Sequence, residues 1–133
     1  MIAGIGIDVV DCARFCELAR EPGSVFVDRT FTAHERRTAS SRPSGEPMTH
    51  LAARYAAKEA CVKALSQALA PSPLPQELAS LLDIEVVNDD DARPQLVLSG
   101  QVRALAEEAG VRTLHLSLSH DGAFAAAVVV AER

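Results

Sequence analysis

Residues 51–65, LAARYAAKEACVKAL, decide the fold of this chain. The stretch contains no helix breaker, and alanine, the residue with the highest helix propensity, fills six of its fifteen positions. The sequence therefore predicts a helix over 51–65, with Thr49 as its N-cap two residues after Pro47. We expect the remaining segments to pack around this helix.

The charged residues of this helix have an unusual distribution. Arg54, Lys58, Glu59 and Lys63 lie among small apolar residues and are not spread over a solvated face. In a helix, Glu59 follows Tyr55 by one turn and precedes Lys63 by one turn, so Glu59 and Lys63 project from one stripe. A carboxylate beside an ammonium can hold a divalent metal and a phosphate side by side. The simpler interpretation is a salt bridge on a surface helix, and spacing alone favours it.

Length and composition predict one folded domain over residues 1–133, because 48% of the residues are hydrophobic. No apolar run approaches the ~20 residues of a membrane helix, and the first residues lack a signal-peptide pattern, so we expect a cytoplasmic protein without membrane contact. The net charge of -5 and the 4% aromatic content argue against nucleic-acid binding. The three cysteines favour free thiols, and we expect Cys12 and Cys16 to be buried small hydrophobic residues and not zinc ligands.

The N-terminal stretch 2–10 predicts a strand whose second face has almost no side-chain bulk. Alternation places Gly4, Gly6 and Asp8 together on that face, opposite the branched residues. The glycines allow close approach of another backbone or of a ligand. A buried acid is costly unless it binds something, which makes Asp8 a candidate ligand. The alternative, that Asp8 caps the next helix, stays open at this point.

The remaining segments predict an α+β domain. Thr32 and Glu35 fit a capping box, which is a sufficient structural reason for Glu35. The run Asn88–Asp91 predicts a solvated turn and not a calcium loop. We expect helices over 12–20, from 32 onward and over 99–109, a turn of helix over 76–82, loops over 40–47 and 70–75, and strands over 84–87, 95–98, 111–119 and 124–131.

Ser119, His120 and Asp121 lie at the turn between the last two expected strands. By strand parity, His120 continues the face of Leu118 and should lie at the edge of the core. A lone histidine there is more often structural than functional. Adjacency in sequence does not make these residues a catalytic triad, because a triad requires convergence in space.

Four stretches, in order along the chain, resemble the holo-acyl-carrier-protein synthases, the small bacterial type of 4'-phosphopantetheinyl transferase. They are GIGID with Asp8, FTAHE with Glu35, RYAAKEACVKA with Glu59 and Lys63, and LSLSH with His120. The match runs from residue 2 to about residue 130. Because the motifs occur together at the family's separation, the resemblance is specific.

Two departures from the family pattern accompany this resemblance. Ser66-Gln67 and a longer proline-rich loop replace a usual glycine-threonine pair, which changes the expected shape of the coenzyme pocket. Ala92-Arg93 precede Pro94 where the family favours glycine, which changes the turn type.

The resemblance implies a fold in which a small antiparallel sheet packs on a long central helix plus shorter helices. It implies transfer of the phosphopantetheine arm of coenzyme A to a serine of apo-acyl carrier protein, in fatty-acid or polyketide synthesis, with release of adenosine 3',5'-bisphosphate. It also implies a homotrimer with coenzyme bound between subunits. Asp8 and Glu59 would hold Mg²⁺, Lys63 would reach the phosphates, and Ser119 and His120 would lie near the adenosine.

The chemistry accounts for these residue types. A hard cation held by carboxylates and substrate phosphates suits the concentrated charge of a pyrophosphate. Lys63 adds a fixed positive charge, and we count Arg54 and Lys58 of the same helix as further coenzyme-binding candidates. The serine hydroxyl needs a base, for which Glu59, a metal-bound water and Asp121 remain open.

Recognition of an acidic carrier protein by an acidic chain requires a local positive patch. Arg14 matches a family position that contacts the carrier. Arg36 and Arg37 could extend this patch, although an interpretation as solvated surface charges is at least as good.

Two other functions compete with the transferase. A Mg²⁺-dependent hydrolase of nucleoside-diphosphate type would use the same acid and lysine, but such enzymes usually carry several acids on one helix. A non-catalytic module could instead bind acidic helical partners through Arg14, Arg36 and Arg37.

Overall fold

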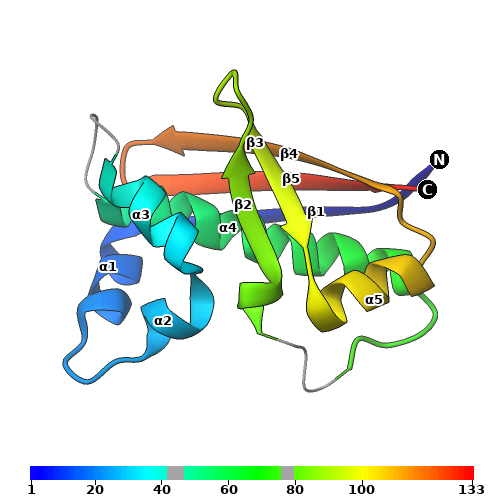
Figure 1. Ribbon diagram of the computed structural model, residues 1–133, viewed down its shortest axis with the longest axis horizontal. Helices are drawn as coiled ribbons and strands as arrows, with labels where there is room; N and C mark the ends of the chain where they lie inside the picture. Colours follow the sequence, from blue (N-terminus) through cyan, green and yellow to red (C-terminus); the bar gives the residue numbers. More distant parts are fainter. Residues whose placement is uncertain (42–46, 76–79) are drawn as a thin grey trace.

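A single long helix, α4 (Pro47–Leu69), crosses the middle of the molecule (Figure 1). The computed structural model describes residues 1–41, 47–75 and 80–133. The helix expected over 51–65 is confirmed and is longer at both ends. Thr49 lies inside α4, so the predicted N-cap is wrong: the helix begins at Pro47, where the missing N–H of proline needs no helical partner.

Three antiparallel strands form the larger sheet, in the order β1 (Ile2–Asp11), β5 (Phe124–Glu132), β4 (Thr113–Asp121). Helix α4 packs on β1 and β5, and the chain termini lie side by side at one end of the sheet (Figure 1). The predicted antiparallel sheet on a central helix is confirmed. The strands β2 (Ile84–Asn88) and β3 (Pro94–Leu98) form a separate two-stranded hairpin.

Two glycines bring β1 into contact with the backbone of α4. A Cβ atom on Gly4 would lie 2.1 Å from the Ala64 carbonyl oxygen, and one on Gly6 would lie 1.8 Å from that of Ala60. Any larger residue would therefore push the helix off the strand. The expected close approach of another backbone at these glycines is confirmed.

Side chains of α4 also bind the free edge of β1. The Ile5 N–H donates to Gln67 Oε1 at 2.8 Å, and Lys63 Nζ donates to the Ile7 carbonyl at 2.9 Å. Gln67 belongs to the pair that departs from the family pattern. Helix α4 runs through this pair without a break, and Gln67 bonds to the strand.

Short helices cover one end of the sheet (Figure 1). Helix α1 (Cys12–Arg20) is capped by Asp11, which accepts hydrogen bonds from the Ala13 and Arg14 amides. The alternative in which Asp8 caps this helix is therefore wrong. Helices α2 (Phe26–Thr30) and α3 (Ala33–Ser41) follow. The rings of Phe15, Phe26, Phe31 and Tyr55 pack together and join these helices to α4.

The cysteines are free thiols, as expected. Cys61 is buried on α4, where burial raises the pKa of its thiol to about 12. Cys12 and Cys16 are only partly buried, so the expectation of two buried residues on α1 is wrong.

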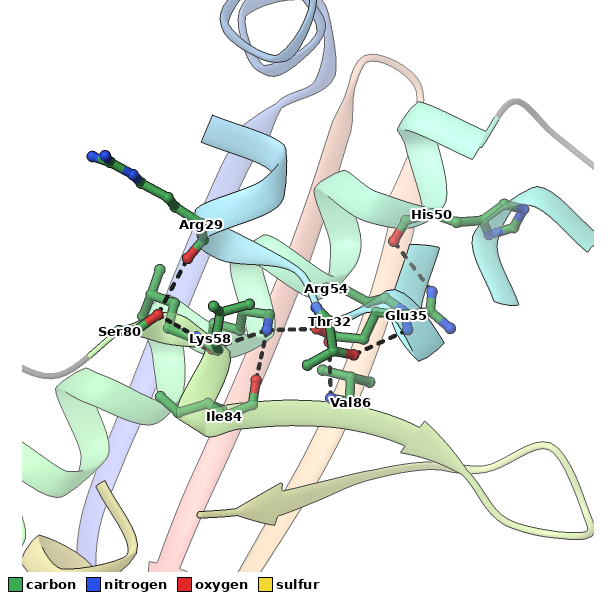
Figure 2. A network of polar contacts seen from close by, with 11 residues as sticks. Arg29, Thr32, Glu35, His50, Arg54, Lys58, Ser80, Ile84 and Val86 are labelled. Carbon is green, nitrogen blue, oxygen red and sulfur yellow. Dashed lines mark hydrogen bonds and ion pairs between the residues drawn. The ribbon is translucent and has the colours of Figure 1, made fainter. Parts of the chain in front are cut away.

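The capping box at the start of α3 is confirmed, but it is only part of the role of Glu35. The Thr32 amide donates to Glu35 Oε1 at 3.0 Å, and the Glu35 amide donates to Thr32 Oγ1 at 3.1 Å. The carboxylate is also fully buried and forms an ion pair with Lys58 at 2.7 Å (Figure 2). Its second oxygen accepts the Val86 amide at 3.0 Å.

Lys58 lies in the interior and not on a coenzyme-binding surface. Its side chain is 0% exposed, and Nζ donates to Glu35, to the Leu81 carbonyl at 3.0 Å and to the Ile84 carbonyl at 2.6 Å. Burial lowers the pKa of this ammonium, and the negative charge of Glu35 opposes that shift. The three N–H groups all have acceptors within the chain. Lys58 therefore holds the fold together, which corrects its assignment as a coenzyme-binding residue.

The segments after α4 complete the second layer. A 3₁₀ turn, η1 (Leu81–Asp83), leads into β2, while most of the turn expected over 76–82 lies outside the described residues. Helix α5 (Gly100–Glu108) follows β3 and ends before Gly110, whose φ of 73° suits a helix terminus. Ser99 makes no side-chain cap bond; Asp83 accepts the Gln101 amide instead. None of the described helices has the length and apolar character of a membrane span.

The buried ion pair generates a prediction about stability. Lys58→Met should lower the free energy of unfolding by about 3–5 kcal/mol, because it leaves the Glu35 carboxylate buried without a counter-charge. The double variant Glu35→Met/Lys58→Met should recover only part of this loss, since both desolvation costs disappear but the Val86 amide and the Leu81 and Ile84 carbonyls stay without partners. Urea titrations monitored by circular dichroism measure both values.

The exposed pair between Arg103 and Glu107 on α5 supplies the control. Arg103→Met should change stability by at most ~0.5 kcal/mol. A Lys58→Met effect as small as this control would contradict the assigned role of the ion pair.

Candidate functional site

Strand β1 and helix α4 bring Asp8, Glu59 and Lys63 together from distant parts of the sequence. Asp8 lies on the glycine-bearing face of β1, which packs on α4, and its side chain is 18% exposed. Lys63 Nζ donates to Asp8 Oδ1 at 3.0 Å. The simpler interpretation, a surface salt bridge between Glu59 and Lys63 alone, is therefore wrong, because the ion pair of Lys63 crosses to the strand.

Glu59 is a half-buried carboxylate beside a second acid. Burial raises its pKa, and the negative charge of Asp8 raises it further. A hydrogen bond from Tyr55 and the charge of Lys63 partly offset this shift. Two carboxylates that repel each other in a poorly solvated position favour a cation between them.

Tyr55 holds its place through the aromatic cluster. Its ring centroid lies 5.7 Å from that of Phe15 and 5.4 Å from that of Phe26. Burial and the nearby Glu59 and Asp8 raise the pKa of the phenol, so its hydroxyl stays protonated and donates to Glu59. Tyr55 thus packs in the aromatic cluster and also holds the Glu59 carboxylate through a hydrogen bond.

A hollow of about 310 Å³ opens beside the two carboxylates. It is lined by Asp8, Tyr55 and Glu59 together with Arg14, Phe15 and Leu18 of α1. Within residues 1–41, 47–75 and 80–133, no cluster of three or more acidic, histidine or cysteine side chains forms a metal site made by protein alone. Two carboxylates that leave the other positions open fit Mg²⁺, which binds through one or two carboxylates and completes its shell with water and phosphate oxygens.

A second hollow, of about 320 Å³, lies around His120. It is lined by His50 and Arg54 of α4 and by Asn88, Ala92, Pro94 and Leu118. The imidazole centroids of His50 and His120 are 6.2 Å apart. Burial, His50 and Arg54 all lower the pKa of His120, in that order of size. His120 and Leu118 share a face of β4, as strand parity predicted, but His120 is exposed, so its expected place at the edge of the core is wrong.

The other candidates near His120 have different surroundings. Arg54 is buried, at 4% exposure, and its guanidinium donates to the His50 carbonyl at 3.3 Å. Ser119 is exposed on the opposite face of β4, and Asp121 ends the strand opposite Phe124. The described chain therefore does not bring Ser119, His120 and Asp121 into a triad.

The structure separates the predicted site residues into two sets on different flanks of α4. Asp8, Glu59 and Arg14 line the first hollow, whereas Arg54 and His120 line the second, and the two linings share no residue. Strand β5 lies between β1 and β4. A ligand that contacts both sets must therefore extend beyond either hollow.

The basic candidates on α3 have surface positions. Arg36 forms an exposed ion pair with Asp28 at 2.9 Å, and Arg36 and Arg37 both line a shallow hollow on α3. This favours their interpretation as solvated charges. Sequence reasoning missed His50 and Asn88; the spacing of His50, one turn before Arg54, was the available signal.

Comparisons with known proteins agree over nearly the whole chain. A family model described as the 4'-phosphopantetheinyl transferase superfamily matches residues 4–129. The chain is 51% identical to a holo-[acyl-carrier-protein] synthase of Salinispora arenicola, with all of both chains covered. It is 47% identical to that of Mycobacterium tuberculosis strain H37Rv, covering 98% of this chain and 97% of the relative. A solved ACPS–CoA complex from Chronobacterium ammoniagenes superposes with a TM-score of 0.87 at 41% identity, covering 96% of this chain and 95% of the other.

Proposed function

The chain belongs to the 4'-phosphopantetheinyl transferase superfamily, and we propose that it converts apo-acyl carrier protein to its holo form. It transfers the 4'-phosphopantetheine arm of coenzyme A to a carrier serine and releases adenosine 3',5'-bisphosphate. The observation that carries this proposal is the meeting of Asp8, Glu59 and Lys63 where β1 crosses α4. The relatives named as holo-[acyl-carrier-protein] synthases and the solved complex with CoA support it. We place this activity in the cytoplasm, as a step of fatty acid biosynthesis.

Asp8 and Glu59 are the residues that would hold Mg²⁺. When bound, this ion would neutralise the charge that develops on the pyrophosphate oxygens. Lys63 is 53% exposed, so its ammonium can keep its contact with Asp8 and still approach a phosphate. Tyr55 orients the Glu59 carboxylate through its hydroxyl. Catalysis on this view is mainly positioning and electrostatics.

The proton of the carrier serine requires an acceptor. Glu59 lies in the same hollow as Asp8, so its carboxylate is placed to accept this proton or to orient a water molecule that accepts it. Asp121 does not line that hollow, and in a single chain it ends the strand farthest from β1 in the sheet. Glu59 is therefore the better candidate within one chain.

We further propose a homotrimer in which the site forms between subunits. The outer face of the larger sheet carries Ile5, Ile7 and Val9, which are 48%, 59% and 60% exposed, beside Val128 at 37%. An apolar sheet face of this kind favours association with another chain. Assembly would also allow one coenzyme molecule to contact the carboxylate set of one subunit and the His120 set of another.

Turnover is tested by incubating an apo-carrier protein with this chain, coenzyme A and Mg²⁺, and measuring the carrier mass. The wild type should add the phosphopantetheine arm. Asp8→Asn and Glu59→Gln should abolish the addition, since each removes a carboxylate that would hold the cation. Hydrolysis of coenzyme A without a carrier adduct would favour the hydrolase. The absence of any calorimetric heat with coenzyme A and Mg²⁺ would favour the interaction module.

The same variants should keep or gain thermal stability, because the folded state disfavours the ionised Glu59. Since folding raises this pKa, the gain from Glu59→Gln should be larger at pH 8, where the carboxyl is ionised in the unfolded state, than at pH 3, where it is protonated in both states. Normal turnover of both variants at limiting Mg²⁺ would contradict the metal assignment.

The assembly is tested by light scattering on a sizing column across a dilution series. The wild type should elute with the mass of a trimer, and Ile7→Glu should lower that mass and the activity together, because it places a charge on the apolar face. Ser117→Glu on β4, which lies opposite Val128 in the register, tests how far the interface extends. A stable monomer with full activity would refute the shared site.

Carrier recognition is tested at Arg14, which lines the carboxylate hollow from α1. Arg14→Glu should raise the KM for the carrier several-fold and leave coenzyme A affinity nearly intact, because a charge at the rim of an interface mainly affects encounter. Rising salt should weaken carrier binding by the wild type more than by the variant. The variant has already lost the attraction between Arg14 and the acidic carrier, so salt has less electrostatic attraction to screen.

Arg103→Glu makes the same charge change on α5, at the other end of the molecule from α1 (Figure 1), and serves as the matched control. Equal effects of Arg14→Glu and Arg103→Glu would indicate a response to net charge alone. Equal weakening of both substrates by Arg14→Glu would place the docking surface elsewhere.

A further inference from the structure

Among the residues that the structure describes, the β2–β3 hairpin forms no backbone ladder with another element. Its strands pair with each other there, and the larger sheet contains β1, β5 and β4. An isolated two-stranded hairpin is marginally stable by itself. The position of this hairpin therefore depends on its packing against α4, α3 and β4.

The apolar part of this contact is poor at fixing one position. Ile84 and Val86 are 0% and 1% exposed, and they belong to the same core as the alanines of α4. Alanine side chains protrude little from a helix and so offer few points for a partner to interlock with, and the hydrophobic effect is non-directional. Apolar burial thus favours contact between the hairpin and α4 without specifying its register.

The buried Glu35–Lys58 ion pair can fix the hairpin in one position on α4. Lys58 donates to the carbonyls of Leu81 and Ile84, and Glu35 accepts the Val86 amide (Figure 2). Three backbone groups around the start of β2 are thereby bonded to charged atoms at fixed points in the core. Such bonds depend strongly on geometry, so a shifted strand would leave buried polar groups without partners.

The far end of the hairpin forms one side of the hollow around His120. Asn88 ends β2, Pro94 begins β3, and the two are partners in the register. The opposite side comes from His50 and Arg54 on α4. Because Asn88 follows Val86 by two residues, the bonds at Val86 and Ile84 act directly on the position of this side of the hollow, which also packs against β4.

We propose that Glu35 and Lys58 are positioning residues for coenzyme binding, because their ion pair fixes the β2–β3 hairpin on α4 and so shapes the hollow between Arg54, Asn88 and His120. The inference rests on the proposed function, in which His120 lies near the adenosine. Both side chains are fully buried, so neither is placed to touch the coenzyme. Their effect passes through the hairpin.

The decisive variant is Glu35→Met/Lys58→Met, which removes both charges and keeps apolar volume in the core. It should be less stable than the wild type, because the Val86 amide and the Leu81 and Ile84 carbonyls lose their charged partners. Its KM for coenzyme A should rise about tenfold, with kcat at saturating coenzyme A and the KM for the carrier nearly unchanged. Hydrogen exchange should show lost protection of amides in β2 and β3.

Leu105→Ala is the matched control for stability. Leu105 belongs to a separate small cluster with Ala68, Leu69 and Ala109 at the other end of α4. Its truncation should lower stability by cavity formation and leave the KM for coenzyme A and the exchange of the hairpin unchanged. The two variants thus separate hairpin position from global stability.

Glu35→Gln provides a second test that keeps the size of the side chain, although it also lowers stability because it leaves the Lys58 ammonium buried without a counter-charge. Its single amide oxygen cannot accept from both Lys58 and the Val86 amide as the carboxylate does. It should raise the KM for coenzyme A severalfold without changing kcat.

Wild-type KM and wild-type hairpin exchange in a folded double variant, or in Glu35→Gln, would overturn the proposal. An equal rise in KM for Leu105→Ala would also overturn it, because general destabilisation would then suffice. If the wild type failed to modify the carrier, the proposed function would fall, whereas the exchange experiment would still report on the hairpin.

Discussion

The backbone contact between β1 and α4 is the constraint on which the rest of the structure depends. Gly4 and Gly6 have no Cβ atoms, so the strand lies against the carbonyls of Ala64 and Ala60. At this separation, Asp8 comes beside Glu59 and within 3.0 Å of Lys63. A larger residue at either glycine would move the carboxylates apart, so the requirement for glycine is also a requirement of the site.

Helix α4 serves two flanks with two stripes of residues at i,i+4 spacing. Tyr55, Glu59, Lys63 and Gln67 face β1, where they bind the edge of the strand and form the carboxylate site. His50, Arg54 and Lys58 lie on the flank toward the hairpin and His120 (Figure 2). The small alanines between the stripes let neighbouring elements pack closely. One helix therefore positions both halves of the candidate site.

Local sequence patterns predicted the helices and strands well. The pairing of Asp8 with Glu59, which lie far apart in the sequence, was predicted only through the resemblance to a family. The alanine-rich stretch, the capping box at Thr32 and the strand parity of His120 depend on near neighbours in sequence, and each was confirmed. Lys58 was misassigned because a lysine among alanines does not show, by spacing, whether it faces solvent or core. Its acceptors, the carbonyls of Leu81 and Ile84, are backbone groups that leave no signature in side-chain chemistry.

The distribution of charge in the fold distinguishes structural from functional ionisable groups. The Glu35–Lys58 pair is fully buried, and its carboxylate and ammonium are saturated with partners, so it has no capacity for a ligand. The Asp8–Glu59 pair is half buried, and both its members carry the same charge, which Lys63 offsets only in part. A folded chain tolerates such an uncompensated pair only at a cost in stability. A bound cation would remove that cost. For this reason the Asp8–Glu59 pair, and not the fully bonded Glu35–Lys58 pair, indicates where the functional site lies.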